Sequence, residues 1–134
     1  MTQRIALVTG AARGIGRAVA LKLAHGGCDI AANYYNSAAE AEALCAEIRA
    51  LGRRAVAIQG SVGIPESVDE IYAEFRKHFD RLDILVSNAA SGVLKPTVEM
   101  TLKHWRWCME TNALALNLLT QRGLPLMGAG ARII

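Results

Sequence analysis

The sequence predicts an α/β protein with a doubly wound parallel sheet, Rossmann-like, incomplete and of about five strands. Short apolar runs alternate with longer segments of helical periodicity along all 134 residues. The hydrophobic fraction is 52% and the aromatic fraction only 5%, so Ala, Val, Ile and Leu carry the core, as in sheets buried on both faces. No linker or low-complexity tract divides the chain. We therefore expect residues 1–134 to be the N-terminal part of a single domain.

The short apolar runs predict five strands, at residues 4–9, 29–34, 54–59, 83–87 and 131–134. Because a helical segment separates each strand from the next, the strands should be parallel with right-handed crossovers. The last run resembles a buried strand that is cut short. A sheet of this kind needs further elements, so we expect these residues to be the first part of a longer protein, or a truncated one.

Helical periodicity predicts two helices in the first half of the chain. One covers residues 14–25 and stops at the glycine pair 26–27. The next begins at Ser37, which has the capping-box spacing to Glu40, and ends at Gly52. The apolar face expected for the first helix consists of Ile15, Ala18, Val19 and Leu23.

Two more helices are predicted in the second half. One begins at Pro65, which suits a first helical turn, and runs to about Phe79. The other is long and mostly apolar, over residues 101–127, with Thr101 as its cap. Pro125 should kink or shorten its end.

The segment between the first strand and the first helix, TGAARGIG at residues 9–16, predicts a nucleotide site. A strand, a glycine loop and a helix in this order suit a dinucleotide pyrophosphate, which lies on free N–H groups at the helix N-terminus. Gly10 permits a sharp turn, Gly14 leaves room for the pyrophosphate, and Gly16 lets the helix pack close to the strand. We expect these glycines and Ile15 to contact the dinucleotide.

Charge and cysteine content argue against other classes of protein. The net charge of +3 comes from 15 basic and 12 acidic residues that are scattered, which gives no support for a nucleic-acid partner. The three cysteines are widely spaced without a CxxC pair, so we expect free thiols and no metal site. The histidines are isolated and suit surface or helix-end positions. No signal-peptide layout and no membrane-length apolar stretch occurs, so the sequence predicts a cytoplasmic protein without a membrane partner.

Three motifs together resemble those of the short-chain dehydrogenase/reductase family. TGAARGIG is similar to the family's TGxxxGxG loop, Ser87-Asn88-Ala89-Ala90 resembles its NNAG motif, and Asn112 falls at the position of its helix asparagine. The resemblance covers all 134 residues but only about the first half of a typical member. It implies cofactor contacts by Asn88, Ala89 and Ala90, although Asn88 could instead hold neighbouring strands. It implies a catalytic role for Asn112, which supports a water relay in the family.

A closer likeness is to one branch of the family, the NADPH-dependent enoyl-acyl-carrier-protein reductases of bacterial fatty-acid synthesis. SNAASGVL at residues 87–94 and HWRW at residues 104–107 resemble the corresponding runs of that branch. The likeness implies hydride transfer to a C=C conjugated with a thioester, in a small-molecule or acyl-carrier-protein-linked substrate. Alternatives are a 3-oxoacyl or other carbonyl reductase of the same family and a truncated, non-catalytic nucleotide-binding module.

The residues after the second strand favour NADP (NADPH) over NAD. An NAD site places an acidic residue there for the ribose hydroxyls, but residues 33–37 read NYYNS, and Asp29 lies at the other end of the strand. Arg13 matches the position at which NADP-using relatives carry a basic residue, which can pair with the 2′-phosphate. Similar enzymes tend to carry a second basic residue near Asn36. We expect Arg13 and Asn36 to lie at the 2′-phosphate.

The resemblance also implies which residues contact the adenine and where the catalytic residues lie. Ser61 and Val62 stand where the family usually carries an Asp that holds the adenine amino group, and Ser61 Oγ can accept the same hydrogen bond without charge. The family's catalytic Ser, and its Tyr with a Lys four residues later, would lie beyond Ile134, since no YxxxK occurs here. We therefore expect residues 1–134 alone to show no turnover.

The long apolar helix corresponds to one that lies at a subunit interface in the family, which implies a homo-oligomer for the full-length protein. Trp105 and Trp107 cannot share one face of that helix. One of them should pack, and the other should lie near a partner or a lid, with a substrate channel as the alternative.

Overall fold

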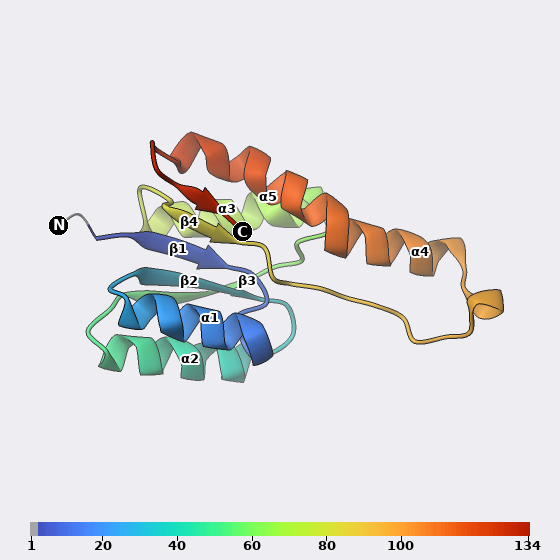
Figure 1. The fold of residues 1–134 in the computed structure, drawn as a ribbon, viewed down its shortest axis with the longest axis horizontal. Helices are drawn as coiled ribbons and strands as arrows, with labels where there is room; N and C mark the ends of the chain where they lie inside the picture. The colour runs from blue at the N-terminus through green and yellow to red at the C-terminus, as the bar shows by residue number, and fades with distance from the viewer. Residues whose placement is uncertain (1–2) are drawn as a thin grey trace.

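The computed structural model describes residues 3–134, and five parallel strands form its single sheet. The strands lie in the order β3-β2-β1-β4-β5, so the direction in which strands are added reverses beside β1 (Figure 1). This order confirms the predicted doubly wound parallel sheet. The strands are β1 (Ile5–Val8), β2 (Asp29–Tyr34), β3 (Ala55–Gln59), β4 (Ile84–Val86) and β5 (Arg132–Ile133).

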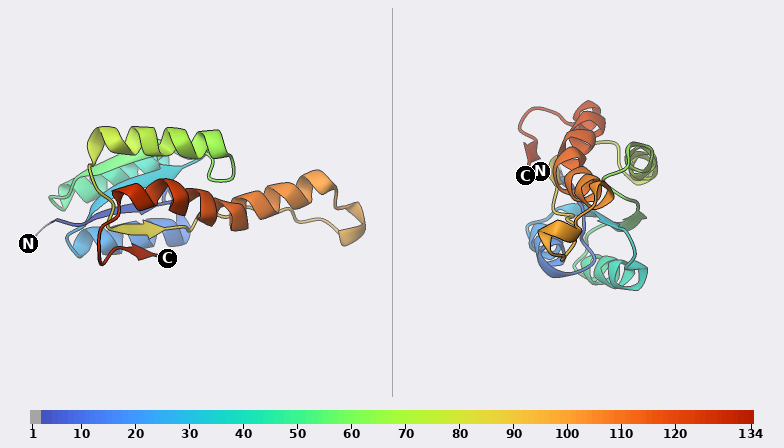
Figure 2. Two further views of the ribbon diagram at one scale, coloured as in Figure 1. Left: turned by 90° about the horizontal axis from the view of Figure 1, so that it is seen from above. Right: turned by 90° about the vertical axis from the view of Figure 1, so that its right-hand side faces the viewer.

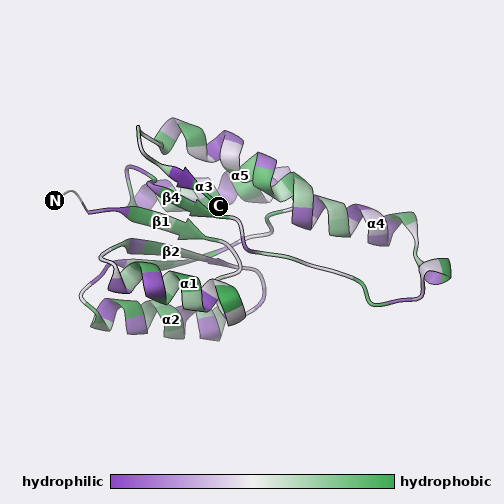
Figure 3. Ribbon diagram, viewed as in Figure 1, coloured by the Kyte–Doolittle hydropathy of each residue, from purple (hydrophilic) through white to green (hydrophobic). Residues whose placement is uncertain are grey.

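Helices cover both faces of the sheet. Figures 1 and 2 show α1 (Gly14–His25) and α2 (Ala38–Ala50) on one face, and α3 (Pro65–His78) and α5 (Ala115–Gly123) on the other. Alternate strand residues therefore enter two cores: Ala6 and Val8 pack towards α1 and α2, whereas Ile5 and Leu7 pack towards α3 and α5. Burial on both faces is why β1 and β4 are continuously hydrophobic (Figure 3).

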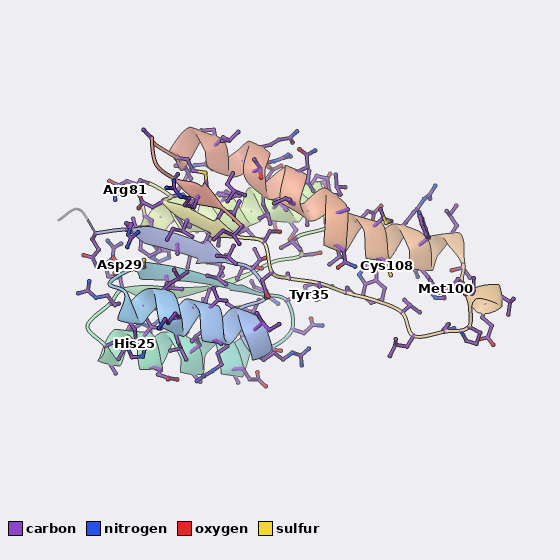
Figure 4. All side chains as sticks on the ribbon, viewed as in Figure 1. His25, Asp29, Tyr35, Arg81, Met100 and Cys108 are labelled. Carbon is purple, nitrogen blue, oxygen red and sulfur yellow. The ribbon has the colours of Figure 1, made fainter. Side chains whose placement is uncertain are left out.

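Two carboxylates join the amino ends of the strands. Asp29 is buried and accepts hydrogen bonds from Gln3 Nε2 at 2.6 Å and from the Arg54 N–H at 2.8 Å. Asp83 accepts a hydrogen bond from the Ile5 N–H at 2.8 Å. Figure 4 shows Asp29 at the end of the sheet opposite Tyr35. Asp29 is therefore a structural residue, remote from the carboxyl ends of the strands, as the sequence predicts.

The apolar face of α1 differs from the predicted one. Ile15 is 75% exposed and Ala18 is exposed, so neither belongs to the core. The residues of α1 that are buried are Gly16, Ala20 and Ala24, one turn apart along the helix. Small side chains on this face let the helix axis approach the sheet closely. Val19 and Leu23 of the predicted face are partly buried and pack against the same core, so the prediction is correct for these two residues and wrong for Ile15 and Ala18.

The predicted capping box at Ser37 is wrong, because the Ser37 side chain makes no capping hydrogen bond. Its backbone has φ −102° and ψ 62°, outside the extended conformation from which a cap hydroxyl reaches the first turn. A capping box lies instead at the start of α4 (Leu102–Met109). There Thr101 Oγ1 accepts a hydrogen bond from the His104 N–H at 3.3 Å, and His104 Nδ1 accepts one from the Thr101 N–H at 3.2 Å.

The helix predicted over residues 101–127 is interrupted. A π-helical turn, η2 (Glu110–Leu114), joins α4 to α5, and the Ala115 N–H donates to the Glu110 carbonyl five residues earlier. Beyond α5 the chain forms a 3₁₀ turn, η3 (Leu124–Leu126), which contains Pro125. The shortened end agrees with the prediction, whereas the π turn has no signal in the sequence pattern.

α4 projects beyond the sheet together with the segment before it, which holds a 3₁₀ turn, η1 (Thr97–Glu99) (Figures 1 and 2). We call residues 92–109 the α4 arm. Both tryptophans are exposed, Trp105 by 61% and Trp107 by 51%, so neither packs in the core as one was expected to do. Further exposed apolar residues of the arm are Leu94, Val98, Leu102 and Met109.

Among residues 3–134, none of the helices combines the length and apolar character that a membrane crossing requires.

The three thiols differ in burial, which predicts their reactivity. Burial raises the pKa of the Cys28 thiol above its ordinary value and that of Cys45 to about 11, whereas Cys108 on the arm is only partly buried (Figure 4). At pH 8 we expect iodoacetamide to label Cys108 in the folded chain and the other two only after unfolding in urea, as measured by mass spectrometry. In a Cys108→Ser variant, labelling of the folded chain should vanish. Labelling of Cys45 as fast as Cys108 would contradict the buried core.

Candidate functional site

A cleft of about 690 Å³ opens at the carboxyl ends of the central strands, beside the point where the strand order reverses. Open α/β sheets bind ligands at this position because neighbouring loops diverge there. Figure 4 shows Tyr35 at this end of β2. The wall of the cleft is formed by Gly10, Ala12, Arg13 and Ile15, by residues 33–37, 60–64 and 88–91, and by Trp107, Glu110 and Thr111.

The glycine loop forms one wall and exposes free N–H groups to the cleft. Gly10 and Gly14 have φ values of +63° and +57°, which other residues rarely adopt. The cap residue of α1, Arg13, makes no side-chain capping bond, and no acidic residue stands in the first turn. The first-turn N–H groups and the positive end of the helix dipole are therefore available to an anion.

Gly16 lets the start of α1 pack closely against Gly10 and Asn88. A Cβ atom at this position would lie 2.2 Å from the Gly10 carbonyl oxygen and 2.6 Å from Asn88 Nδ2. No side chain fits there, so the glycine that the sequence predicts for close packing is required sterically.

A network of hydrogen bonds ties the glycine loop to the end of β4. The buried Thr9 Oγ1 accepts from the Asn88 N–H at 3.0 Å and from the Ala89 N–H at 3.1 Å. In return, Asn88 Nδ2 donates to the Thr9 carbonyl at 3.0 Å. Asn88 thus joins neighbouring strands, one of the two roles that the sequence left open, and it also lines the cleft.

The segment after β2 forms the second wall. Asn33 is buried, and its Nδ2 donates to the Ile58 and Gly60 carbonyls at 3.1 and 3.2 Å, which holds the ends of β2 and β3 together. The chain beyond it turns towards Arg13, so that Asn36 and Arg13 line the same cleft. Ser37 lines it too, with a hydroxyl that caps nothing. Sequence reasoning missed Ser37 because it treated this residue as a helix cap.

The segment after β3 and the η2 turn close the remaining side. Ser61 and Val62 line the cleft, and the Ser61 N–H donates to Ser67 Oγ at 2.8 Å. Asn112, in η2, makes two hydrogen bonds to the backbone of Ser91. Its Nδ2 donates to the Ser91 carbonyl at 2.7 Å, and its Oδ1 accepts from the Ser91 N–H at 2.9 Å. This pair fixes the 88–91 segment to the π turn, a feature that often marks functional sites.

Most of the predicted site residues come together in this cleft. Gly14 and Gly16 shape the loop without lining the wall. Asn112 does not line it either, but it is hydrogen-bonded to Ser91, which does. The binding and catalytic roles assigned to these residues stay predictions. The predicted residues on the wall are Gly10, Arg13, Ile15, Asn36, Ser61, Val62, Asn88, Ala89 and Ala90.

The chain is similar to curated oxidoreductases over its whole length. The family model described as short chain dehydrogenase matches residues 4–134. The hydroxynaphthalene reductase arp2 of Aspergillus fumigatus is 37% identical over 134 residues, which are 100% of this chain and 49% of that protein. The 3-oxoacyl-[acyl-carrier-protein] reductase of Synechocystis is 39% identical over 129 residues, which are 95% of this chain and 51% of that protein. The chain thus spans about half the length of the curated relatives it matches.

A solved structure agrees with the same assignment. A short chain dehydrogenase from Burkholderia cenocepacia, crystallised in complex with NADP, superposes with a TM-score of 0.92 at 40% identity and covers 98% of this chain and 53% of that one. The fold, the glycine loop and the match over residues 4–134 lead to one conclusion: the chain belongs to the short-chain dehydrogenase family of oxidoreductases.

Proposed function

We propose that this chain is the NADP-binding part of a reductase that acts on a carbonyl group. The observation that carries the proposal is the cleft, where a glycine loop, a free helix N-terminus and a segment after β2 without carboxylates meet. The cofactor supplies the hydride when it is bound. The glycine loop and the first turn of α1 would hold its pyrophosphate, because Gly14 leaves open space where a Cβ atom would otherwise stand.

The preference for NADP over NAD rests on the side chains around Asn36. No carboxylate lines this part of the cleft, whereas the Arg13 guanidinium, the Asn36 amide and the Ser37 hydroxyl do. Within residues 3–134, Arg13 forms no ion pair, so its charge is available to a ligand. Similar enzymes tend to carry a second basic residue near Asn36, where this chain offers the Asn36 amide and the Ser37 hydroxyl. The complex of the Burkholderia cenocepacia relative with NADP supports this choice.

The Arg13→Ala variant is expected to bind NADPH about 10- to 100-fold more weakly than the unmodified chain, with little change for NADH. A charge-assisted hydrogen bond to phosphate contributes about 1.5–3 kcal/mol, and NADH has no 2′-phosphate. Calorimetric titration of both cofactors measures the difference. Arg17→Ala is the matched control, because Arg17 is paired with Glu47 and does not line the cleft. An equal loss of affinity for both cofactors would show that Arg13 does not read the 2′-phosphate.

The substrate class proposed is a 3-oxoacyl thioester or another ketone. The similarity to the Synechocystis 3-oxoacyl-[acyl-carrier-protein] reductase supports carbonyl reduction over the enoyl reduction that SNAASGVL suggests. The test uses a longer product of the same coding sequence that carries a YxxxK beyond Ile134. NADPH oxidation should proceed with an acetoacetyl thioester and not with a crotonyl thioester. Reduction of the crotonyl substrate alone would favour the enoyl reductase instead.

Residues 1–134 alone should bind NADPH without oxidising it. Asn112 and Ser91 would position the wall beside the reacting groups, but the family's Tyr and Lys are not among these residues. Binding without turnover is also what a non-catalytic nucleotide-binding module would show. A stop codon directly after Ile134 in the gene would favour that alternative.

We further propose that the full-length protein is a cytoplasmic homo-oligomer. The exposed apolar residues of the α4 arm support self-association, since an unpartnered apolar surface of this kind is unfavourable in water. Analytical ultracentrifugation tests this proposal.

A further inference from the structure

The α4 arm brings an aromatic side chain to the cleft. Trp107 lines the cleft together with Glu110 and Thr111. These two residues follow it by three and four positions, so all three lie on one side of the helical segment. Trp105, two positions earlier, is exposed by 61% and does not line the cleft.

The segment after β3 determines which part of the cleft Trp107 faces. A Cβ atom on Gly63 would lie 3.1 Å from the Thr111 N atom and 3.1 Å from the Glu110 carbonyl carbon, so this segment touches η2 directly. Trp107 stands one turn farther out on the same side, and Ile64 follows Gly63. Trp107 is 51% exposed and Ile64 49%, and both line the cleft.

The two half-exposed apolar side chains therefore border the part of the cleft that contains Ser61 and Val62. On the proposed function, this part takes the adenine ring. Ser61 offers a hydroxyl there rather than a carboxylate, so polar recognition of the adenine amino group is weak. An aromatic side chain can supply the missing binding energy, because base–aromatic contacts stabilise bound nucleotides without needing a charge.

We propose that the Trp107 indole forms an aromatic wall against which the adenine of the cofactor packs, with Ile64 beside it. This inference rests on the proposed function and adds a cofactor-contacting residue from the arm. Trp107 then links the α4 arm to the cleft, because it belongs to α4 and lines the cleft.

The affinity test uses 2′,5′-ADP, which contains the adenine half of NADP and no nicotinamide. The Trp107→Ala variant is expected to bind it about tenfold more weakly than the unmodified chain, and Trp107→Phe should restore most of the affinity. Trp105→Ala is the matched control and should leave the affinity unchanged. Equal affinities of the Trp107→Ala and Trp105→Ala variants would overturn the proposal.

Fluorescence provides a second measurement that needs no truncated side chain at position 107. The chain has two tryptophans, so Trp105→Phe leaves Trp107 as its single indole. Saturating 2′,5′-ADP should then quench the emission, nicotinamide mononucleotide should not, and the Trp107→Phe variant should give no response. Binding of 2′,5′-ADP without quenching would refute the Trp107 contact and leave the proposed function intact. Absence of any binding to the unmodified chain would refute both.

Discussion

Replacing Gly16 by alanine is expected to lower the free energy of unfolding by about 3 kcal/mol and to abolish detectable NADPH binding. The new methyl group would lie 2.2 Å from the Gly10 carbonyl oxygen and 2.6 Å from Asn88 Nδ2. Backbone atoms cannot rotate away as a flexible side chain can, so α1 must move from the loop. That movement displaces both the glycine loop and Asn88, which line the same cleft. Urea unfolding and calorimetric titration measure the two effects.

Gly128→Ala is the control for the intrinsic effect of removing a glycine. A Cβ atom at Gly128 meets no atom within 4 Å, and the residue does not have a positive φ. The free energy of unfolding of this variant should lie within about 0.5 kcal/mol of that of the unmodified chain, and the variant should bind NADPH equally well. A Gly16→Ala chain with unchanged affinity would mean that the loop can accommodate the methyl group.

The order of the elements and the position of the cleft could be predicted from the sequence because both depend on local patterns. Apolar runs of strand length, separated by helical segments, predicted the parallel sheet, and parallel strands end on the same edge. The glycine loop could be placed at that edge because it directly follows the first apolar run. The strands differ from the prediction mainly by losing a terminal residue or two, as β1 and β4 do.

The roles of individual side chains were less predictable, because they depend on contacts between segments that are distant in sequence. Periodicity placed Ile15 on the buried face of α1, but close approach to the sheet requires the small residues Gly16, Ala20 and Ala24. Ser37 has the spacing of a helix cap, and only its backbone angles show that the hydroxyl faces elsewhere. A local sequence motif cannot distinguish a buried side chain from an exposed one, or a hydroxyl that caps a helix from one that does not.

The course of the α4 arm also depends on contacts that a local pattern does not contain. Helical periodicity treats residues 101–127 as one continuous helix, and on such a helix neither tryptophan is distinguished from the other. The η2 turn adds a residue to one helical turn and changes the direction of the side chains on either side of it. Trp107 lines the cleft and Trp105 does not, a difference that depends on how η2 packs against Gly63.

Replacing Thr9 by valine is expected to lower the free energy of unfolding by about 2–3 kcal/mol and to weaken NADPH binding at least tenfold. Valine has nearly the same shape as threonine, so it should preserve the packing of this fully buried side chain. It removes the oxygen that accepts from the Asn88 and Ala89 N–H groups, and both donors lose a partner. The 88–91 segment, which lines the cleft, is then held mainly by Asn88 Nδ2 and by the Asn112–Ser91 pair.

Thr9→Ser separates this hydrogen-bond effect from a packing effect. Serine keeps the hydroxyl and loses only the methyl group, so it should retain most of the NADPH affinity while losing about 1 kcal/mol of stability. If the hydrogen bonds hold the 88–91 segment, the NADPH affinity should depend on the presence of the hydroxyl at position 9 and not on the volume of the side chain. Equal affinities for the valine and serine variants would show that the wall of the cleft does not depend on the Thr9 hydroxyl. The Asn88 amide and the Asn112–Ser91 pair would then be sufficient to keep the carboxyl end of β4 beside the glycine loop.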